Sequence, residues 1–176
     1  MKRFFRLFAA VPALLIVLLS GCGYHTAGKA SRLPADVKVL AVPVFVNQTQ
    51  VFRIEQIMTR DVVREFIERT RYHVTNASGD SADATLKGTV VSAQATPLTY
   101  DAQTGRISSA VVVITAKVTL TDRNGRVLFE NLNYTFREQY QVSSEINSFF
   151  AEEAPAMQRL SRDFARTLVA DILEAF

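Results

Sequence analysis

The sequence between residues 107 and 121 alternates between apolar and polar side chains, the periodicity of a β-strand with one covered face. Asp122-Arg123-Asn124-Gly125 follows, and its Asn-Gly pair favours a tight hairpin turn into another strand at residues 127–140. A further strand is expected before this pair, at residues 84–96. We therefore expect three long antiparallel strands in succession. The covered face of the central strand consists of Ala110, Val112, Ile114, Ala116, Val118 and Leu120.

Two amphipathic helices flank these strands. The first is expected over residues 53–71, and the second over residues 152–174, after a loop at residues 141–150. In each helix apolar residues recur at steps of three and four, which gives a single apolar stripe. The stripes consist of Ile54, Ile57, Met58, Val62 and Phe66 in the first helix and of Met157, Leu160, Phe164, Leu168 and Ile172 in the second.

A buried strand is expected before the first helix, at residues 37–46, because this segment is β-branched and apolar on both faces. Pro43 lacks a backbone donor and indicates an edge position or a bulge near the strand's end. The element order predicts an α+β fold, a two-layer sandwich in which a mixed sheet of about four strands carries both helices on one face. The first strand should lie parallel to a neighbour through a helical crossover.

The N-terminus has the layout of a secretory leader. Lys2, Arg3 and Arg6 precede an apolar run at residues 7–19, which is well short of the roughly 20 residues that span a bilayer. Leu19-Ser20-Gly21-Cys22 then matches the box at which bacterial lipoproteins are cleaved. We expect residues 1–21 to be removed as a signal peptide and Cys22 to carry acyl chains such as palmitate. Residues 22–35 would form a lipidated tether and residues 36–176 a single domain.

Composition excludes several function classes once the leader is set aside. Three of the 20 basic residues lie in the leader, so 17 basic residues face 17 acidic ones, and nucleic-acid binding loses its main support. Cys22 is the only cysteine, so no internal disulfide can form. The two histidines, His25 and His73, lie apart, and no phosphate-binding loop or nucleophile motif occurs. We expect no enzyme, no cofactor and no metal site.

Arginines are the remaining candidates for binding. Arg106, Arg123 and Arg126 lie in turns between strands, where binding residues are often found, although turn solubility explains them equally well. The outward sides of both helices also carry arginines, which indicates either a solvated face or a surface for an anionic partner. These are Arg53, Arg60, Arg64 and Arg71 on the first helix and Arg159, Arg162 and Arg166 on the second.

The outer face of the predicted sheet carries more apolar side chains than two helices can cover. Val111, Val113, Phe129, Tyr134 and Tyr140 are assigned to it. A monomer rarely leaves such a patch exposed. Either the twist of the sheet hides these side chains or a partner protein docks on them, and we favour a partner.

Several segments resemble the LptE family of lipopolysaccharide-assembly lipoproteins. The resemblance begins at Cys22-Gly23-Tyr24-His25 and continues with VKVLAVPVFVNQT before an amphipathic helix. It extends through DATLKGTVVS, LTYDAQTGRISS, VTLTDRNGRVLFEN and YTFREQYQV ahead of the terminal helix. These segments keep the family's order and span nearly the whole mature chain.

The resemblance implies an outer-membrane lipoprotein that sits as a plug inside the LptD β-barrel on the periplasmic side. There it would help the barrel to assemble and lipopolysaccharide to reach the outer leaflet, and Gly23 agrees with outer-membrane sorting. Another lipid-anchored periplasmic adaptor, such as a cell-wall synthase activator or a secretion-complex subunit, is the alternative.

The resemblance also implies direct contact with lipopolysaccharide through basic residues, one in a strand-connecting loop and others near the last helix. Arg106 corresponds to the first by its place in the loop. Residues 141–150 contain no Lys or Arg, so Arg137 is the basic residue nearest to the second. The candidate anion-binding residues are thus Arg106, Arg137, Arg123 and Arg126.

Overall fold

The computed structural model describes residues 37–77, 81–142 and 153–175, all within the compact unit Ser31–Phe176. The predicted signal peptide, Cys22 and the tether lie outside these residues, as does most of the predicted loop at residues 141–150. The elements are β1 (Val39–Ala41), β2 (Val46–Asn47), α2 (Ile54–Arg69), β3 (His73–Thr75), β4 (Ala84–Tyr100), β5 (Ile107–Asp122), β6 (Val127–Gln141) and α3 (Glu153–Glu174).

These elements form the predicted α+β fold. The sheet has the strand order β3-β1-β4-β5-β6, and β2 also pairs with β4. The three long strands form an antiparallel meander, whereas β1 and β2 run parallel to β4 and β3 runs parallel to β1. The sheet is therefore mixed, as predicted. It has six strands instead of about four, because the first predicted strand is divided and the chain adds a short strand after α2.

An irregularity in the segment that contains Pro43 divides the first strand. Ala41 pairs with Thr85 and Val46 with Thr89, so one extra residue lies between these pairs on the first strand. Phe45 then turns its side chain under the helices, and its backbone N–H donates to the buried hydroxyl of Thr59 at 3.0 Å. The side-chain partner satisfies a backbone donor that the interrupted ladder leaves free.

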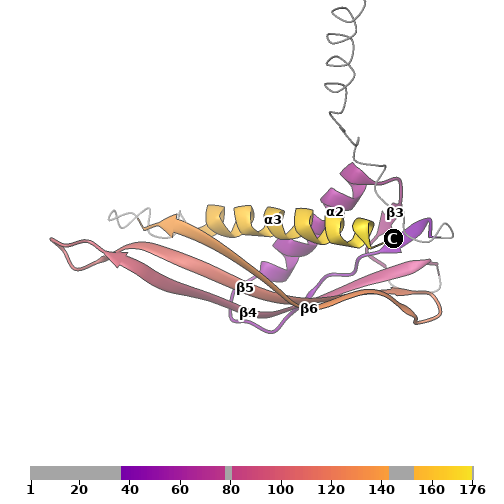
Figure 1. Ribbon diagram of the computed structural model, residues 1–176, viewed down its shortest axis with the longest axis horizontal. Coiled ribbons are helices and arrows are strands. Elements are labelled where there is room, and N and C mark those ends of the chain that lie inside the picture. Colours follow the sequence, from indigo (N-terminus) through magenta and orange to yellow (C-terminus); the bar gives the residue numbers. More distant parts are fainter. Residues whose placement is uncertain (1–36, 78–80, 143–152, 176) are drawn as a thin grey trace, which may run out of the picture. The chain divides into compact units, whose positions relative to one another are not determined.

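Both helices cover the same face of the sheet (Figure 1). The predicted stripes point into the core, except that Ile57 is only half-buried. Phe164 of α3 lies at the centre of an aromatic cluster, edge-on to Phe45, Tyr134 and Phe136 at ring-centre distances of 6.3, 5.9 and 5.4 Å. Edge-to-face contacts of this kind stabilise a core beyond simple area burial.

The prediction for the outer face of the sheet was wrong for three of its five residues. Phe129 pairs with Leu120, Tyr134 with Ala116 and Tyr140 with Ala110, so all three face the helices. A bulge in β6, beyond Phe129, explains the error at Tyr134 and Tyr140. It inserts one residue between the pairs Val118–Asn131 and Ala116–Tyr134, which reverses the alternation along the strand. Val111 and Val113 do lie on the outer face, next to polar neighbours.

Neither helix is long and apolar enough to cross a membrane, as judged from the residues that the structure describes.

Candidate functional site

The face of the sheet that points away from the helices is the largest candidate surface, and we call it the open face. It is built from alternate residues of β4, β5 and β6, which the ladder places side by side. Within the described ranges no helix covers it (Figure 1). Its residues are Lys87, Thr89, Ser92, Gln94 and Thr96 on β4, Val111, Val113, Thr115, Lys117 and Thr119 on β5, and Glu130, Thr135, Arg137 and Gln139 on β6.

Hydroxyl groups and positive charges dominate the open face. Thr115 and Thr135 are cross-strand neighbours with their hydroxyls 3.5 Å apart, and the Thr119 hydroxyl donates to Glu130 at 3.4 Å. Lys87, Lys117 and Arg137 are exposed on the same surface. Such a surface can form hydrogen bonds with a polar partner. Its threonine side chains are β-branched, so their rotation is restricted.

The β4–β5 turn at one end of the sheet presents Arg106. Asp101 accepts hydrogen bonds from the backbone N–H of Thr104, from its hydroxyl and from the backbone N–H of Gln103, and these bonds lower the pKa of Asp101. Gly105 supplies the left-handed conformation, with a φ of 67°. Hydrogen bonds within the turn thus hold its shape, and the side chains of Arg106 and Tyr100 are both exposed.

The β5–β6 turn at the other end uses its arginines differently. Asp122 accepts from the backbone N–H groups of Arg126 and Asn124 and from the Arg126 guanidinium, and together these lower its pKa. Arg123 forms an ion pair with Asp83, whose carboxylate also accepts from the backbone N–H groups of Val39 and Lys38. Both arginines therefore hold the turn and the start of β1 in place.

The four candidate arginines do not form one site. In an antiparallel meander the two successive turns lie at opposite ends of the sheet, so Arg106 is separated from Arg123 and Arg126. Arg137 pairs with Val113 on the open face, in the half nearer Arg106. It lies roughly 20 Å from the β4–β5 turn along the strands, at about 3.4 Å per residue. Arg106 and Arg137 make no ion pair within the described parts of the chain.

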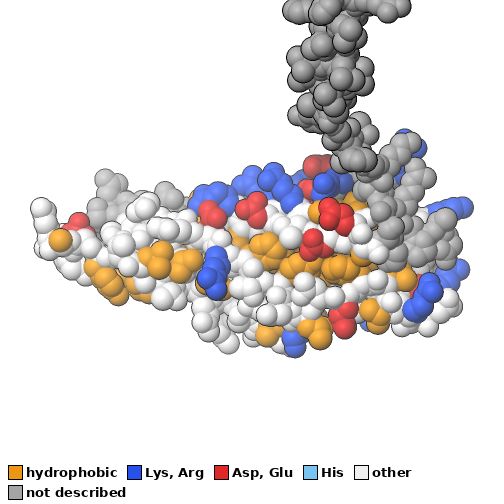
Figure 2. Space-filling model, in the orientation of Figure 1, with side chains coloured by type: hydrophobic (Ala, Val, Ile, Leu, Met, Phe, Trp, Pro, Cys, Tyr) orange, Lys and Arg blue, Asp and Glu red, His pale blue; other side chains and the backbone are white. Residues whose placement is uncertain are grey.

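The helical arginines are mostly engaged by acids. Arg60 and Arg64 both lie 3.3 Å from the buried carboxylate of Asp61, and Arg166 lies 3.7 Å from Asp163. Arg159 pairs with Glu138 of β6. Lys and Arg side chains gather on the helical side of the molecule, above a band of apolar side chains between helix and sheet (Figure 2). This arrangement favours the interpretation of a solvated, ion-paired face.

The sequence prediction missed Lys87 and Lys117 as candidate binding residues. Lys117 stands at an odd position of the alternating strand, so the sequence alone places it on the face away from the helices. Lys87 follows only from the register, which pairs it with Thr119. No group of three or more His, Cys, Asp or Glu side chains could hold a metal ion in the portion of the chain that the structure describes.

Comparison with protein families gives a match over nearly the whole described domain. The family model described as LptE, lipopolysaccharide-assembly, matches residues 37–172. Comparison with curated proteins gives no significant match.

Solved structures share the fold at low sequence identity. A putative lipoprotein from Caulobacter crescentus has a TM-score of 0.52 at 12% identity, with 74% of this chain and 88% of that chain covered. For uncharacterized lipoprotein B from Nitrosomonas europaea the values are 0.51 and 14%, with 80% and 88% covered. A protein from Xanthomonas campestris gives 0.52 and 14%, with 83% and 91% covered. At such identities the likeness concerns the fold alone.

Proposed function

Because the chain belongs to the lipopolysaccharide-assembly family LptE, we propose that it is an outer-membrane lipoprotein that plugs the LptD β-barrel. In this role it helps the barrel to assemble and helps lipopolysaccharide to reach the outer leaflet. The family match over residues 37–172 is the observation that carries the proposal.

The chemistry of the open face supports a partner with a polar wall. The lumen of an outer-membrane barrel is polar, so a plug needs hydroxyl and charged groups on the surface that meets it. The rows of threonine on β4 and β5, with Lys87 and Lys117 among them, have this character. We therefore assign the open face to the barrel lumen. This replaces the apolar docking surface expected from the sequence.

Lipidation at Cys22 would hold the domain at the membrane in which its partner is built. Each buried methylene of an acyl chain contributes about 0.8 kcal/mol, and more than one chain makes the anchoring durable. In this proposal the lipid supplies the location, and protein contacts on the open face supply the specificity.

Contact with lipopolysaccharide is assigned to the half of the sheet that carries Arg106 and Arg137. Both guanidinium groups are exposed, and an anionic phosphate can bind an arginine by two parallel hydrogen bonds. Arg123 and Arg126 are less suitable, because binding a phosphate would compete with their ion pairs to Asp83 and Asp122.

Co-purification in detergent tests the proposed partner. We expect the full lipoprotein to recover LptD. Thr115→Arg places a long charged side chain at the centre of the open face, and it should reduce recovery by roughly tenfold, since a buried unpaired charge costs more than ~1.4 kcal/mol. The matched control, Thr167→Arg on the exposed side of α3, should leave recovery unchanged.

Two results would contradict the proposal. Recovery of a cell-wall synthase or a secretion complex in place of LptD would make the chain a different lipid-anchored adaptor. Equal recovery of LptD by both variants would leave the partner in place but remove the open face from the contact. Thermal unfolding of both variants shows that neither result arises from misfolding.

A further inference from the structure

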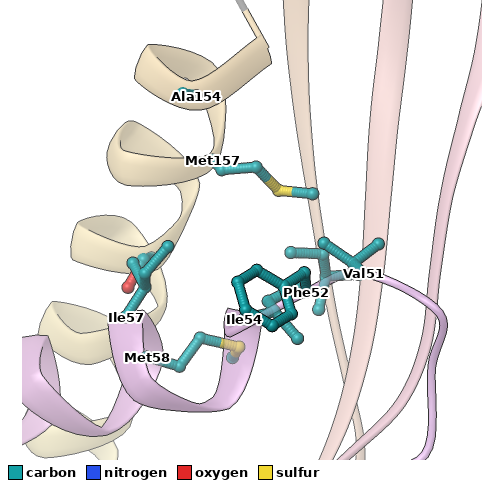
Figure 3. A pocket seen from close by; sticks show the side chains of 9 residues that line it. Val51, Phe52, Ile54, Ile57, Met58, Ala154 and Met157 are labelled. Carbon is teal, nitrogen blue, oxygen red and sulfur yellow. The ribbon is translucent and has the colours of Figure 1, made fainter.

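A pocket opens between the first turns of α2 and α3 above β5. Its volume is about 200 Å³, and almost every side chain that lines it is apolar, among them Ile54, Ile57, Met58 and Met157. Figure 3 shows Val51, from the segment before α2, and Met157, from α3, beside the same space, with Phe52 next to Val51. An apolar cavity of about 150 Å³ suffices to bind benzene. This pocket therefore has room for the end of one hydrocarbon chain and not for a whole lipid.

One polar atom in this pocket lacks a partner. Ser161 lies on α3 with 1% of its surface exposed, and its hydroxyl makes no hydrogen bond within the described part of the chain. A buried hydroxyl left unpaired costs free energy, so such groups are rare without a reason. A ligand that is mostly hydrocarbon but carries a carbonyl or hydroxyl oxygen would supply the missing partner.

The rim of the pocket has an unusual backbone. Arg53 caps the N-terminus of α2 in the left-handed conformation, with a φ of 59° and no side-chain capping hydrogen bond. Helix N-caps are usually Ser, Thr, Asp or Asn in extended conformation. This strained residue places the Phe52 ring on the outside, 79% exposed, with the Arg53 guanidinium 4.7 Å from the ring centre. Strain of this kind clusters at functional sites.

A polar cleft adjoins the apolar pocket and shares Val51 and Phe52 with it. Arg53 lines it, and this arginine makes no ion pair among the described residues. The cleft also contains Glu55, whose carboxylate already accepts from the Asn47 amide at 3.0 Å. The mouth therefore carries one positive charge, on Arg53, and one negative charge, on Glu55, which the neutral Asn47 amide does not cancel.

We propose that this pocket binds one acyl chain of a lipid whose polar head group lies in the adjoining cleft. The chain end lies against Met58 and Met157, an oxygen of the chain pairs with the Ser161 hydroxyl, and the head group meets Arg53 and Glu55 in the adjoining cleft. Methionine side chains adapt to flexible ligands, which suits a site for a mobile chain. The pocket lies on the helical side of the sheet, away from the open face, so this site does not depend on the proposed contact with LptD.

Photocrosslinking tests the proposal with the lipoprotein in isolated envelope membranes. The probe is 3-hydroxytetradecanoic acid with a diazirine near its methyl end, so it carries a chain oxygen for Ser161 besides its carboxylate, and labelled peptides are identified by mass spectrometry. We expect the label on residues 51–58 and 154–161, and we expect excess unlabelled 3-hydroxytetradecanoate to abolish it. Labelling elsewhere, or labelling that 3-hydroxytetradecanoate does not compete away, would overturn the proposal.

Matched variants locate the site. Ala154→Trp places a large ring at the exposed rim of the pocket and should reduce the label by roughly tenfold. Thr167→Trp places the same ring on the exposed side of α3, away from the pocket, and should leave the label unchanged. Ile57→Trp places a ring in the pocket from the α2 side. It replaces Ala154→Trp in the experiment if that variant fails to accumulate. Equal labelling of pocket and control variants would sink the proposal.

Ser161→Ala separates a binding role from a structural one. Removing an unpaired buried hydroxyl should leave the thermal midpoint of the free protein unchanged or higher, whereas labelling should fall several-fold because the ligand loses its partner. Unchanged labelling would remove Ser161 from the site. Competition with lipopolysaccharide or with lysophosphatidylglycerol then identifies the source of the chain. Competition by neither would contradict the proposed lipid ligand.

Discussion

The hydroxyl of Tyr134 on β6 donates a 2.6 Å hydrogen bond to the carboxylate of Asp171 on α3. The ring of the same tyrosine stacks on Phe136 and lies edge-on to Phe164. The last strand and the last helix are thus joined by a polar contact at the margin of the aromatic cluster. Burial and the hydrogen bond to Asp171 both raise the pKa of Tyr134 above its ordinary value.

Tyr134→Phe should destabilise the domain by about 1–3 kcal/mol, the usual range for a hydrogen bond to a charged group. The pH dependence gives a second signature. Because the folded pKa is raised, this contribution is complete below the unfolded value near 10 and is lost as the pH rises above it. Urea unfolding at pH 7 and pH 10.5 gives the free energy of unfolding of each protein. Between these pH values it should fall less in the variant than in the parent. An identical alkaline slope in both proteins would contradict this assignment.

Gly88 on β4 provides space for the Phe45 ring. A Cβ at this position would lie 2.6 Å from ring carbons of Phe45, too close for any van der Waals contact. Gly88→Ala should therefore destabilise the fold by about 1–3 kcal/mol, the cost of overpacking, although alanine is otherwise acceptable in a strand. Phe45→Leu should recover part of this loss in the double variant. Additive effects of the two substitutions in urea unfolding would show that the ring is not the obstacle.

Asp83 joins the start of β1 to the β5–β6 turn and should contribute to stability only while it is ionised. Hydrogen bonds from the backbone N–H groups of Val39 and Lys38, together with Arg123, lower its pKa. Its contribution is present above the unfolded value near 3.8 and is lost as the pH falls through the lower folded value. Asp83→Asn should be destabilised at pH 7, and the difference from the parent should shrink below about pH 4. Acid and neutral unfolding curves measure this, and a difference that is constant with pH would contradict it.

Much of the fold follows from local periodicity. The alternation along β5 and the stripes of α2 and α3 are set by which side chains must leave water, and the structure confirms them. The face of β6 beyond Asn131 could not be predicted, because a residue inserted near Leu132 and Asn133 reverses the alternation there. Nothing in the local sequence distinguishes that bulge from a regular strand. Tyr134 was assigned to the wrong face for this reason.

The candidate site was predictable only in part. The element order alone places Arg106 and Arg123 at opposite ends of the meander, so their separation was accessible from the sequence. The engagement of Arg123 with Asp83 was not, because the two residues are 40 positions apart. The pocket around Ser161 depends on how the N-terminal parts of α2 and α3 pack over β5. A sequence pattern does not show whether that packing leaves a cavity.

Cys22 remains a prediction, and its substitution tests the anchor. Cys22→Ala, exported behind an ordinary cleaved leader, should leave the domain folded and release it from the membrane fraction, because its only acylation site is lost. Fractionation and circular dichroism measure the two outcomes against the parent. A variant that is exported but unfolded would give this cysteine a structural role, and one that stays with the membrane would show that protein contacts suffice for anchoring.

Charge reversal separates the binding arginines from the structural ones. Arg106→Glu should weaken binding to lipopolysaccharide by roughly tenfold, since one charge-assisted contact contributes about 1.5–3 kcal/mol, and it should leave stability and LptD recovery unchanged. Arg123→Glu should lower the stability of the domain and leave lipopolysaccharide binding unchanged. It places a carboxylate next to Asp83 and opens the β5–β6 turn. Binding isotherms and unfolding curves on both variants measure the difference. If Arg106→Glu binds lipopolysaccharide like the parent, the contact lies elsewhere, and the same measurement on Arg137→Glu shows whether the open face provides it.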